Sequence, residues 1–582
     1  MKKSLADQLK SKADQLATMG MEVDQTTRLD QWQTDPESVP RMYRAQVKGR
    51  CSLHDASKGN QDLDWWAREW TFPNEKGEAK YQRSCPPLGQ QGAIYRVEVE
   101  FPFRVFSNGG QDSIARPMIG KDGIPFLPGS SVKGLFLRAC TTEQAAKYCG
   151  REVRQQGKMQ HLPGTAPLRF HGAYPVGNWA NRIVDLVHPQ GNRQIGTDPL
   201  KTTKNRKEQE ESASASALIS LYQPQLVFEF SCPPQQFEQI NWREVESILI
   251  GAMQLGVGGK TSSGYGLGGN IPGKPPIRPN TRLSFKLEGK GVSPTLRDGT
   301  PEFRPNLFKA ALRGHTRRLL AGVAQGTTVD DVVHRWFGHT KSAATIQLIW
   351  QERRVAQFAD INRPDLNPTY NVEGILYADF QPRSVRQQDE RDIALLQKIF
   401  EFAYVMGGFG KSWRRVWHET FMPNYHKSNF AIGCHWLSSE VDEIQTSKHL
   451  REFLTRLHTQ CCAYLGVDEH KTQAANWRES WHPNRVAVFC RTGMNSTAVA
   501  LFHDDTFKTT PAIGGRNPND ERPKFVSSVW HRMLPLKNGT EYLEIVTVFH
   551  GDRTPWVDQL QHFVQAVKNA GLKHTWGTEP TP

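Results

Sequence analysis

The sequence predicts an α+β protein made of two tandem domains with long insertions. Three observations support this prediction: strands of alternating apolar and polar residues, a basic helix after two of these strands, and apolar helices that run into glycine-rich turns. With 582 residues the chain is also too long for a single hydrophobic core.

The two halves begin with the same parts in the same order. The first opens with the strand YRVEVEF (95–101) and the second with RLSFKLEG (282–289). After an irregular loop, each strand is followed by a basic helix, FLPGSSVKGLFLRAC (126–140) in one half and FRPNLFKAALRGHTRRLLAGV (303–323) in the other. This repetition predicts an internal duplication.

The later parts of the halves also correspond. WREVESILIGAMQLGVGGKTSSGYG (242–266) and DIALLQKIFEFAYVMGGFGKSWRRVW (392–417) each run from an apolar helix into a glycine-rich turn and then Lys or Arg. Further on, the strands NRVAVFC (484–490) and EYLEIVTVFHG (541–551) are expected to complete the second sheet, before a final amphipathic helix, WVDQLQHFVQAVKNAG (556–571).

These patterns give a domain plan. We expect an N-terminal extension (1–90), a first domain (91–270) with an insertion near 145–217, a proline-rich linker (271–281), a second domain (282–560) and a C-terminal tail (561–582).

Composition restricts the partners and the compartment. With 73 Lys and Arg against 59 Asp and Glu, the net charge of +14 favours a polyanionic partner, although a basic protein without such a partner has the same balance. The nine cysteines form no CxxC pair, which argues against a disulfide framework and a zinc finger. We expect a cytoplasmic protein without a membrane partner, because the N-terminus is charged and no apolar run approaches the ~20 residues of a membrane span.

The segment QLGVGGKTSSGYGLGGN (254–270) has the composition of a nucleotide-binding loop but not the context. Gln254 stands where a P-loop has its first glycine, and the segment follows a helix instead of a strand. A dinucleotide fingerprint also fails, because NIPGKPP (270–276) cannot open a helix. We therefore expect no nucleotide cofactor.

Two interpretations of this segment remain. It is either a glycine-rich turn between a helix and a strand, or a loop that binds an extended RNA strand through its backbone amides and nearby side chains. The RNA-binding interpretation uses Gly258, Gly259, Lys260, Thr261, Ser262 and, for stacking on a base, Tyr265.

Here the sequence resembles a known family. FLPGSSVKGLFLRAC followed by LGVGGKTSSGYG resembles the RAMP superfamily of CRISPR-associated RNA-binding proteins, and LRFHGAYPVGNWANRIVDLVHPQ (168–190) resembles a segment of the terminal RAMP subunit of Cmr-type complexes. EFRPNLFKAALRGHTRRLLAG (302–322) followed by WFGHTKSAATIQLIW (336–350) is similar to another Cmr subunit. The resemblance covers roughly residues 92–551.

The resemblance implies a fold and partners. It implies two tandem ferredoxin-like, RRM-like RAMP domains in a backbone subunit of a type III CRISPR effector, of the Csm or Cmr kind. The implied partners are CRISPR RNA, a complementary target RNA, the large subunit and further RAMP subunits.

The two basic segments supply further candidate RNA contacts. In the first, Ser130 or Ser131 is expected to cap the helix, so that free amides and Lys133 bind the guide backbone; the alternative is a capped helix with a solvated lysine. In the second half, a basic stripe on the helix and a cluster of Lys, Arg and Trp after the glycine turn suggest RNA contact, or simply a solvated face. The remaining candidates are Arg138, Lys309, Arg313, Arg317, Lys411, Trp413, Arg414 and Arg415.

Candidate catalytic residues follow from the resemblance. Related backbone subunits cut target RNA with an aspartate in the loop between the first strand and the basic helix, and Asp112 and Asp298 occupy that place in the two halves. Each would act with a divalent cation, Mg²⁺, and each stands in a context that also suits a turn residue. Asp122 is interpreted as a hairpin turn residue, and Asp185 with His188 as part of a structural segment.

Three functions are carried forward. The chain is expected to hold CRISPR RNA in the effector and to contribute metal-dependent cleavage of the target RNA. Alternatively it is a structural cap for the guide, with both aspartates inert. A third possibility is a guide-processing endoribonuclease that uses a histidine such as His315 as its general acid or base.

Overall fold

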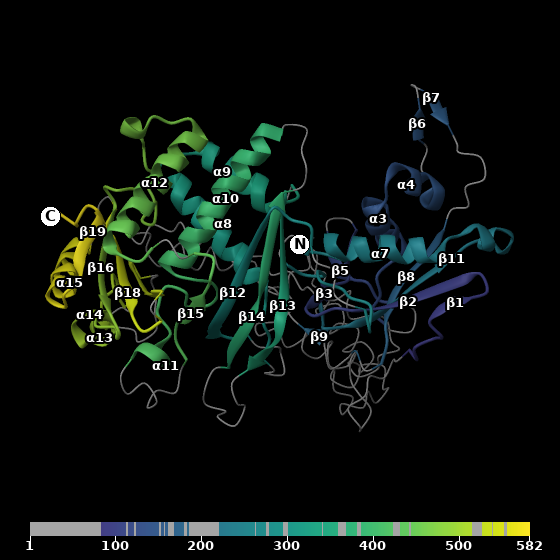
Figure 1. Ribbon diagram of the computed structural model, residues 1–582, viewed down its shortest axis with the longest axis horizontal. Helices are drawn as coiled ribbons and strands as arrows, with labels where there is room; N and C mark the ends of the chain where they lie inside the picture. Colours follow the sequence, from purple (N-terminus) through teal and green to yellow (C-terminus); the bar gives the residue numbers. More distant parts are fainter. Residues whose placement is uncertain are drawn as a thin grey trace, which may run out of the picture.

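The computed structural model places three four-stranded antiparallel sheets in a row along the longest axis of the molecule (Figure 1). We call the parts built on them the first unit (83–270), the second unit (282–437) and the third unit (486–577). The described residues are 83–581 except 112–113, 121–123, 151–152, 156–157, 161–167, 178, 180–182, 185–219, 262–263, 275–278, 295–300, 340–341, 359–367, 381–385, 423–430, 442–443, 515–526, 538 and 552–555.

The first unit is built on a sheet with the strand order β1-β2-β11-β8. Val97 and Val99 of β2 and Val132 and Phe136 of α3 belong to one core, because residues two apart on a strand and four apart on a helix share a face. Its elements are β1 (Gly89–Gln91), β2 (Ile94–Glu100), β3 (Arg104–Phe106), β4 (Asn108–Gln111), β5 (Ile114–Pro117), α3 (Gly129–Ala139), α4 (Thr142–Cys149), β6 (Val153–Gln155), β7 (Lys158–Gln160), β8 (Arg169–Pro175), β9 (Ile183–Val184), β10 (Ser220–Tyr222), β11 (Gln225–Ser231), η5 (Pro234–Gln239) and α7 (Trp242–Leu255).

The second unit has the strand order β13-β14-β12-β15. The strand expected at 282–289 is the first part of β12, and the basic helix expected at 303–323 is α8. The elements from here to the third unit are β12 (Leu283–Val292), α8 (Asn306–Ala321), α9 (Thr327–Phe337), β13 (Ile346–Phe358), β14 (Thr369–Phe380), α10 (Arg386–Met406), α11 (His418–Phe421), β15 (Cys434–Leu437), α12 (Ser447–Leu465) and η8 (Glu469–Lys471).

The third unit corrects one expectation from the sequence. The strands at 484–490 and 541–551 do not complete the second sheet; they are β16 and β18 of a separate sheet with the order β17-β18-β16-β19. The helix near 560 and the strand after it belong to the same unit instead of a tail. Its elements are β16 (Val486–Gly493), α13 (Ala498–His503), α14 (Asp505–Lys508), β17 (Val529–Pro535), β18 (Tyr542–Phe549), α15 (Val557–Asn569) and β19 (Lys573–Gly577).

Helices α8, α10 and α12 lie between the second and third sheets. Residues of both sheets share one core with α10, and α10 contacts β14 of one sheet and β17 of the other. Leu396, Tyr404 and Val405 project in different directions around α10, and each is buried. Arg391, Ala394 and Gln397 lie on one face of the helix and are exposed, so α10 is buried where it faces the two sheets and the neighbouring helices and open to solvent along this face.

The first and second units meet in an interface of packed side chains. Gln347 of β13 donates a hydrogen bond from Nε2 to the carbonyl oxygen of Gln254, at 2.8 Å. Leu267, from the end of the glycine-rich loop, packs against Ile349 and Tyr377 of the second sheet. The two units are therefore joined by direct contacts as well as by the proline-rich segment between them.

Candidate nucleic-acid interface

The glycine-rich loop of the first unit is folded back onto β3. The amide of Gly259 donates to the carbonyl of Phe106 at 3.0 Å, and the amide of Gly266 donates to the carbonyl of Arg104 at 2.7 Å. Gly258 has a φ of +76°, and a Cβ there would lie 2.1 Å from the Phe106 carbonyl oxygen. The inner side of the loop is therefore a packed turn, which leaves its outer side for a ligand.

The outer side of the loop carries part of the predicted RNA contact. Gly258 and Lys260 are exposed, and Gly259 and Thr261 are half-buried. Ser262 lies outside the described residues. Contact of this surface with RNA phosphates stays a prediction, with Lys260 as its accessible cation.

Tyr265 has a different place from the one expected. Its side chain is only 6% exposed, its ring meets that of Phe106 edge-on at 4.7 Å, and its hydroxyl accepts a hydrogen bond from Nδ2 of Asn306 at 2.8 Å. A ring held in this way ties the loop to the start of α8 and has no free face on which a base can stack.

Helix α3 begins two or three residues earlier than capping by Ser130 or Ser131 would require. Its N-cap is Pro128, which has no side chain that can accept a hydrogen bond, so the expected capping by Ser130 or Ser131 is wrong. The reason is local packing: Gly129 lies so close to β8 that a Cβ would sit 1.9 Å from the Phe170 carbonyl oxygen, and the glycine has to be the first helical residue.

The uncapped start of α3 still presents the predicted polar side chains. Ser130, Ser131 and Lys133 in its first turns are exposed, and so is Arg138 in its last turn. Because no side chain caps the helix and its first turn contains no acidic residue, this end can accept an anion.

A short series of backbone hydrogen bonds connects the loop with this helix. The Gly259 amide reaches Phe106, the Met118 amide donates to the Ser107 carbonyl at 2.7 Å, and the Phe126 amide donates to the Met118 carbonyl at 3.0 Å. Phe126 lies three residues before the first residue of α3, and Ser107 and Met118 flank the β4–β5 hairpin. The structure thus brings the glycine-rich loop, the root of this hairpin and the start of α3 together.

The first candidate aspartate lies within the hairpin segment. Asp112 follows β4 and precedes β5 in the chain, and it lies outside the described residues. Asp122, Asp185 and His188 also lie outside the described residues. The described neighbours, Gln111 and Ile114, are paired across the hairpin. Catalysis by Asp112 stays a prediction.

The basic stripe of α8 is a packed surface. Lys309 is 8% exposed, and burial together with neighbouring Arg313 lowers its pKa to about 8. Arg317 pairs with Asp330 of α9 at 2.8 Å. The stripe therefore contributes to the contact between α8 and α9. Arg313 lies between Lys309 and Arg317 on the helix and is half-buried.

The cluster after the second glycine turn joins the second and third units. The Trp413 ring contacts those of His315 at 4.9 Å and Trp530 at 4.8 Å, and Arg414 donates to Glu479 at 2.8 Å. Arg415 donates to the backbone carbonyls of Val529 and Ile513 and to the Ser527 hydroxyl, at 2.8, 3.1 and 2.9 Å. Exposed Lys411 is the member of this cluster that an RNA strand can reach.

The second candidate aspartate, Asp298, lies outside the described residues, within 295–300. The ends of that segment are held together: the Glu302 amide donates to the Pro294 carbonyl at 3.0 Å, and the Ser293 hydroxyl donates to the Glu302 carbonyl at 2.8 Å. The segment therefore leaves from, and returns to, the junction of the first two units.

His315 cannot act as the general acid or base that one alternative required. Its side chain is fully buried, and among the described residues neither ring nitrogen has a hydrogen-bond partner. Burial and the neighbouring Arg318 and Arg414 hold its pKa well below the ordinary value. A histidine inside the core is out of reach of an RNA substrate, so His315 cannot be the histidine that guide processing would need.

No metal site or membrane segment is found in the part of the chain that the structure describes. In that part, no three His, Cys, Asp or Glu side chains gather in a group that could hold a metal ion. None of its helices combines the length and the apolar character that a bilayer crossing requires.

Comparisons with known proteins give structural neighbours only. No protein-family model and no curated protein matches the chain. Among solved structures it is similar to Cmr1 from Pyrococcus furiosus in its apo form, with 14% identity and a TM-score of 0.31 over 50% of this chain and 98% of that one. It is also similar to a chain of type III-B Cmr-beta bound to cognate target RNA, with 8% identity and a TM-score of 0.29 over 51% and 96%.

A third neighbour is a chain of a type IV-B CRISPR complex, with 14% identity and a TM-score of 0.18 over 32% of this chain and 94% of that one. These three neighbours are two Cmr proteins and a chain of a CRISPR complex. The identities and TM-scores are low, so these likenesses do not establish a function.

Proposed function

We propose that the chain is an RNA-binding backbone subunit of a type III CRISPR effector complex, and that it holds the CRISPR RNA at the first unit. The observation that carries this proposal is the convergence of the glycine-rich loop, the hairpin root and the start of α3 through consecutive backbone hydrogen bonds. Lys260 and Lys133 are the exposed cations on this surface. Backbone amides and lysines of this kind fix a strand by its phosphates without reading its sequence.

We further propose that all three units are ferredoxin-like, one more than the sequence suggested. The second and third units each run strand, helices, two strands, helix, strand, and each sheet has its chain-order strands arranged 2-3-1-4. The first unit has the corresponding succession β2, α3 and α4, β8, β11 and α7, with further short strands between these elements, and Asn270 then pairs with Glu100 at the sheet edge.

This arrangement favours loops over sheet faces as RNA-binding surfaces. The second sheet carries α8 and α10 on one face. On its other face the end of the glycine-rich loop covers part of β13 and β14, while Ser284, Lys286, Glu288 and Lys290 of β12 are exposed. The third sheet packs against helices on both faces. An RRM binds bases by stacking them on aromatic side chains of an open sheet, and the exposed side chains of β12 include no aromatic ring. We therefore propose that the RNA strand runs along the loops and helix ends of the first unit.

Target cleavage by Asp112 and Asp298 is part of the proposal. A carboxylate beside a ribose 2′-OH favours loss of its proton, after which the 2′ oxygen attacks the adjacent phosphorus and the bond to the 5′ oxygen breaks. A divalent ion, when bound, would supply a hydrated positive charge that stabilises the developing negative charge. The alternative remains a guide-holding cap in which both aspartates are inert.

The binding proposal is tested with the purified full chain and a labelled single-stranded guide RNA. A Lys133→Ala/Lys260→Ala variant is expected to bind about tenfold more weakly at moderate salt, with a salt dependence reduced by roughly 0.7 per lysine removed. Lys448→Ala is the matched control, because Lys448 on α12 has an 81% exposed side chain far along the chain from the proposed surface. Equal weakening by the control would contradict the placement of the RNA.

A further inference from the structure

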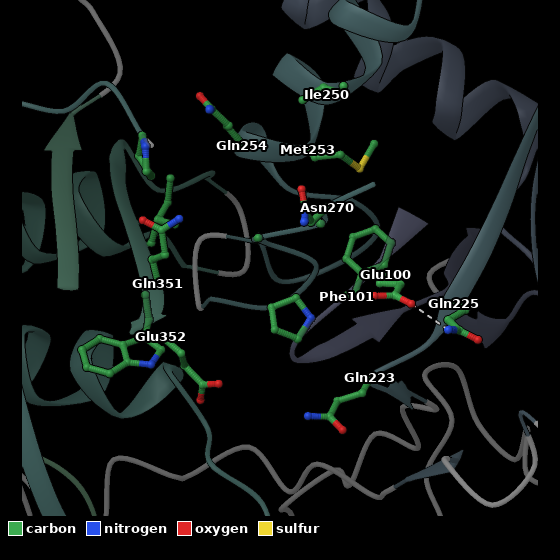
Figure 2. Close-up of a pocket in the computed structure, with 16 residues that line it drawn as sticks. Glu100, Phe101, Gln223, Gln225, Ile250, Met253, Gln254, Asn270, Gln351 and Glu352 are labelled. Carbon is green, nitrogen blue, oxygen red and sulfur yellow. Dashed lines mark hydrogen bonds between the residues drawn. The ribbon is translucent and has the colours of Figure 1, made fainter. Parts of the chain in front are cut away.

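A cavity of about 430 Å³ lies between the first and second units (Figure 2). One wall comes from the ends of β2 and β11, from α7 and from the last residues of the glycine-rich loop; the opposite wall comes from β13. The cavity is of the size of small-ligand sites in proteins. A bare cation would leave most of it unfilled, since a water molecule takes up only about 30 Å³.

The polar groups of the cavity are carboxylates and amides. Glu100 of the first unit and Glu352 of the second unit stand on opposite walls (Figure 2), and Gln225 donates to Glu100 at 2.8 Å. Gln223 and Gln351 add side-chain amides, and no described lining residue is a lysine or an arginine. In a basic, RNA-binding chain, such a lining repels phosphate and suits a group rich in hydrogen-bond donors.

The remaining lining is apolar and rigidly held. Phe101, Ile250 and Met253 line the side of the first unit. The backbones of Glu100 and Asn270 are paired by hydrogen bonds of 2.8 and 2.9 Å. Burial raises the pKa of Glu352 to about 7, and a hydrogen bond from the backbone of Ala356 offsets only part of the cost of burying this carboxylate. An apolar slot with acceptors at its ends has the form of a nucleobase site.

Among the bases, guanine fits these acceptors best. Its Watson–Crick edge presents the adjacent donors N1–H and N2–H, which a single carboxylate can accept together, whereas adenine and cytosine present one amino group beside an acceptor. We propose that the cavity receives a guanine base of a bound RNA strand, with Glu352 accepting these two donors. The inference rests on the proposed function, because Gly268 and Gly269 of the RNA-binding loop form part of the cavity wall.

The test uses the full chain and paired probes. Single-stranded oligouridylate with one central guanosine is compared with the same strand carrying inosine, which lacks the 2-amino group, and free guanosine is compared with free inosine. We expect the guanosine strand to bind about tenfold more tightly than the inosine strand, the usual discrimination of one bidentate contact. Glu352→Gln should abolish this preference.

The matched control is Glu238→Gln. Glu238 is exposed in η5, which precedes α7, whereas the cavity lies at the other end of that helix. The control is expected to keep the preference of the wild-type chain for guanosine. Circular dichroism of both variants checks that the chain remains folded.

The outcomes separate the inference from the proposed function. The inference is overturned if the wild-type chain shows no preference for guanosine, or if Glu352→Gln keeps that preference. In either case the proposed function stands if Lys133→Ala/Lys260→Ala still weakens RNA binding. Preference for free guanosine without a strand preference also overturns it, because the base would then come from a free nucleoside. Guanosine binding by a chain that binds no RNA overturns the proposed function instead.

Discussion

Arg104 of β3 and Glu302, which precedes α8, form a buried ion pair across the junction of the first and second units. The Arg104 side chain is 2% exposed and that of Glu302 is fully buried. Nε of Arg104 donates to Oε2 of Glu302 at 2.6 Å, and a second Arg104 nitrogen donates to the other carboxylate oxygen. Arg304 also pairs with this carboxylate. The bidentate contact fixes the strand beneath the glycine-rich loop relative to α8.

Removing the arginine is expected to destabilise the junction. Arg104→Met leaves Glu302 buried with the weaker support of Arg304, and the free energy of unfolding should fall by about 3–5 kcal/mol. Arg354→Met is the control, because its ion pair with Glu373 is exposed and should contribute less than about 1 kcal/mol. Urea denaturation measures both, and equal effects would show that the buried pair has no special role.

Glu352 is expected to make stability depend on pH. Its folded-state pKa, about 7, is raised above the ordinary value of 4.5, so its favourable contribution is present at low pH and is lost as pH rises through 7. Glu352→Gln should therefore gain about 1–2 kcal/mol relative to the wild-type chain between pH 5 and pH 8, after allowance for its partial exposure.

Denaturation series across this pH range measure the difference between the two chains. Glu238→Gln, at an exposed position, should stay within about 0.5 kcal/mol of the wild-type chain throughout. A pH-independent difference for Glu352→Gln would refute the assignment.

The candidate aspartates are expected to act independently. In a reconstituted, guide-loaded complex with magnesium, Asp112→Ala and Asp298→Ala should each remove one cleavage product of a complementary RNA, with a rate loss of at least about 10²-fold, while RNA binding persists. Chelator should suppress both products. Asp505→Ala, at an 88% exposed side chain of the third unit, serves as the control. Survival of every product in both variants would identify the chain as a guide-holding cap.

We expect Arg415 to contribute to the stability of the fold and Lys411 to contribute to RNA binding. Arg415→Met removes donors from two backbone carbonyls and a hydroxyl at the contact with the third unit, and should lower stability by about 2–4 kcal/mol without changing RNA affinity while the chain is folded. Lys411→Ala, at an exposed position, should weaken RNA binding without lowering stability. Thermal unfolding and RNA titration of both variants measure this, and the opposite result would exchange the two roles.

Helices and strands were predicted correctly from the sequence where the periodicity of apolar residues within one segment identifies the element. The strand at 95–101 and the helix at 126–140 could be recognised because their apolar residues repeat with the period of the structure they form. The strand that pairs with 484–490 could not be recognised, because alternating apolar residues show that one face of a strand is buried but not which strand lies beside it.

The site was predicted less completely, for the same physical reason. An exposed Lys260 and a buried Tyr265 look equivalent in the loop sequence, and only the contact with Asn306 distinguishes them. Trp and Arg are common both on base-stacking surfaces and in contacts between domains, so the sequence alone could not show that Trp413 and Arg415 form a domain contact. Ser130 would have capped α3 if Gly129 did not lie against Phe170.

The position of α10 between two sheets has a consequence for synthesis of the chain. When α10 leaves the ribosome, three of the four strands of the second sheet have already been made, and β15 follows soon after. The strands β17 and β18, which cover the other side of α10, follow about 140 residues later, roughly 7–30 s at ordinary rates of translation. During that interval an apolar helix surface faces water or a chaperone. The nascent chain is thus most prone to aggregation just before its C-terminal strands arrive.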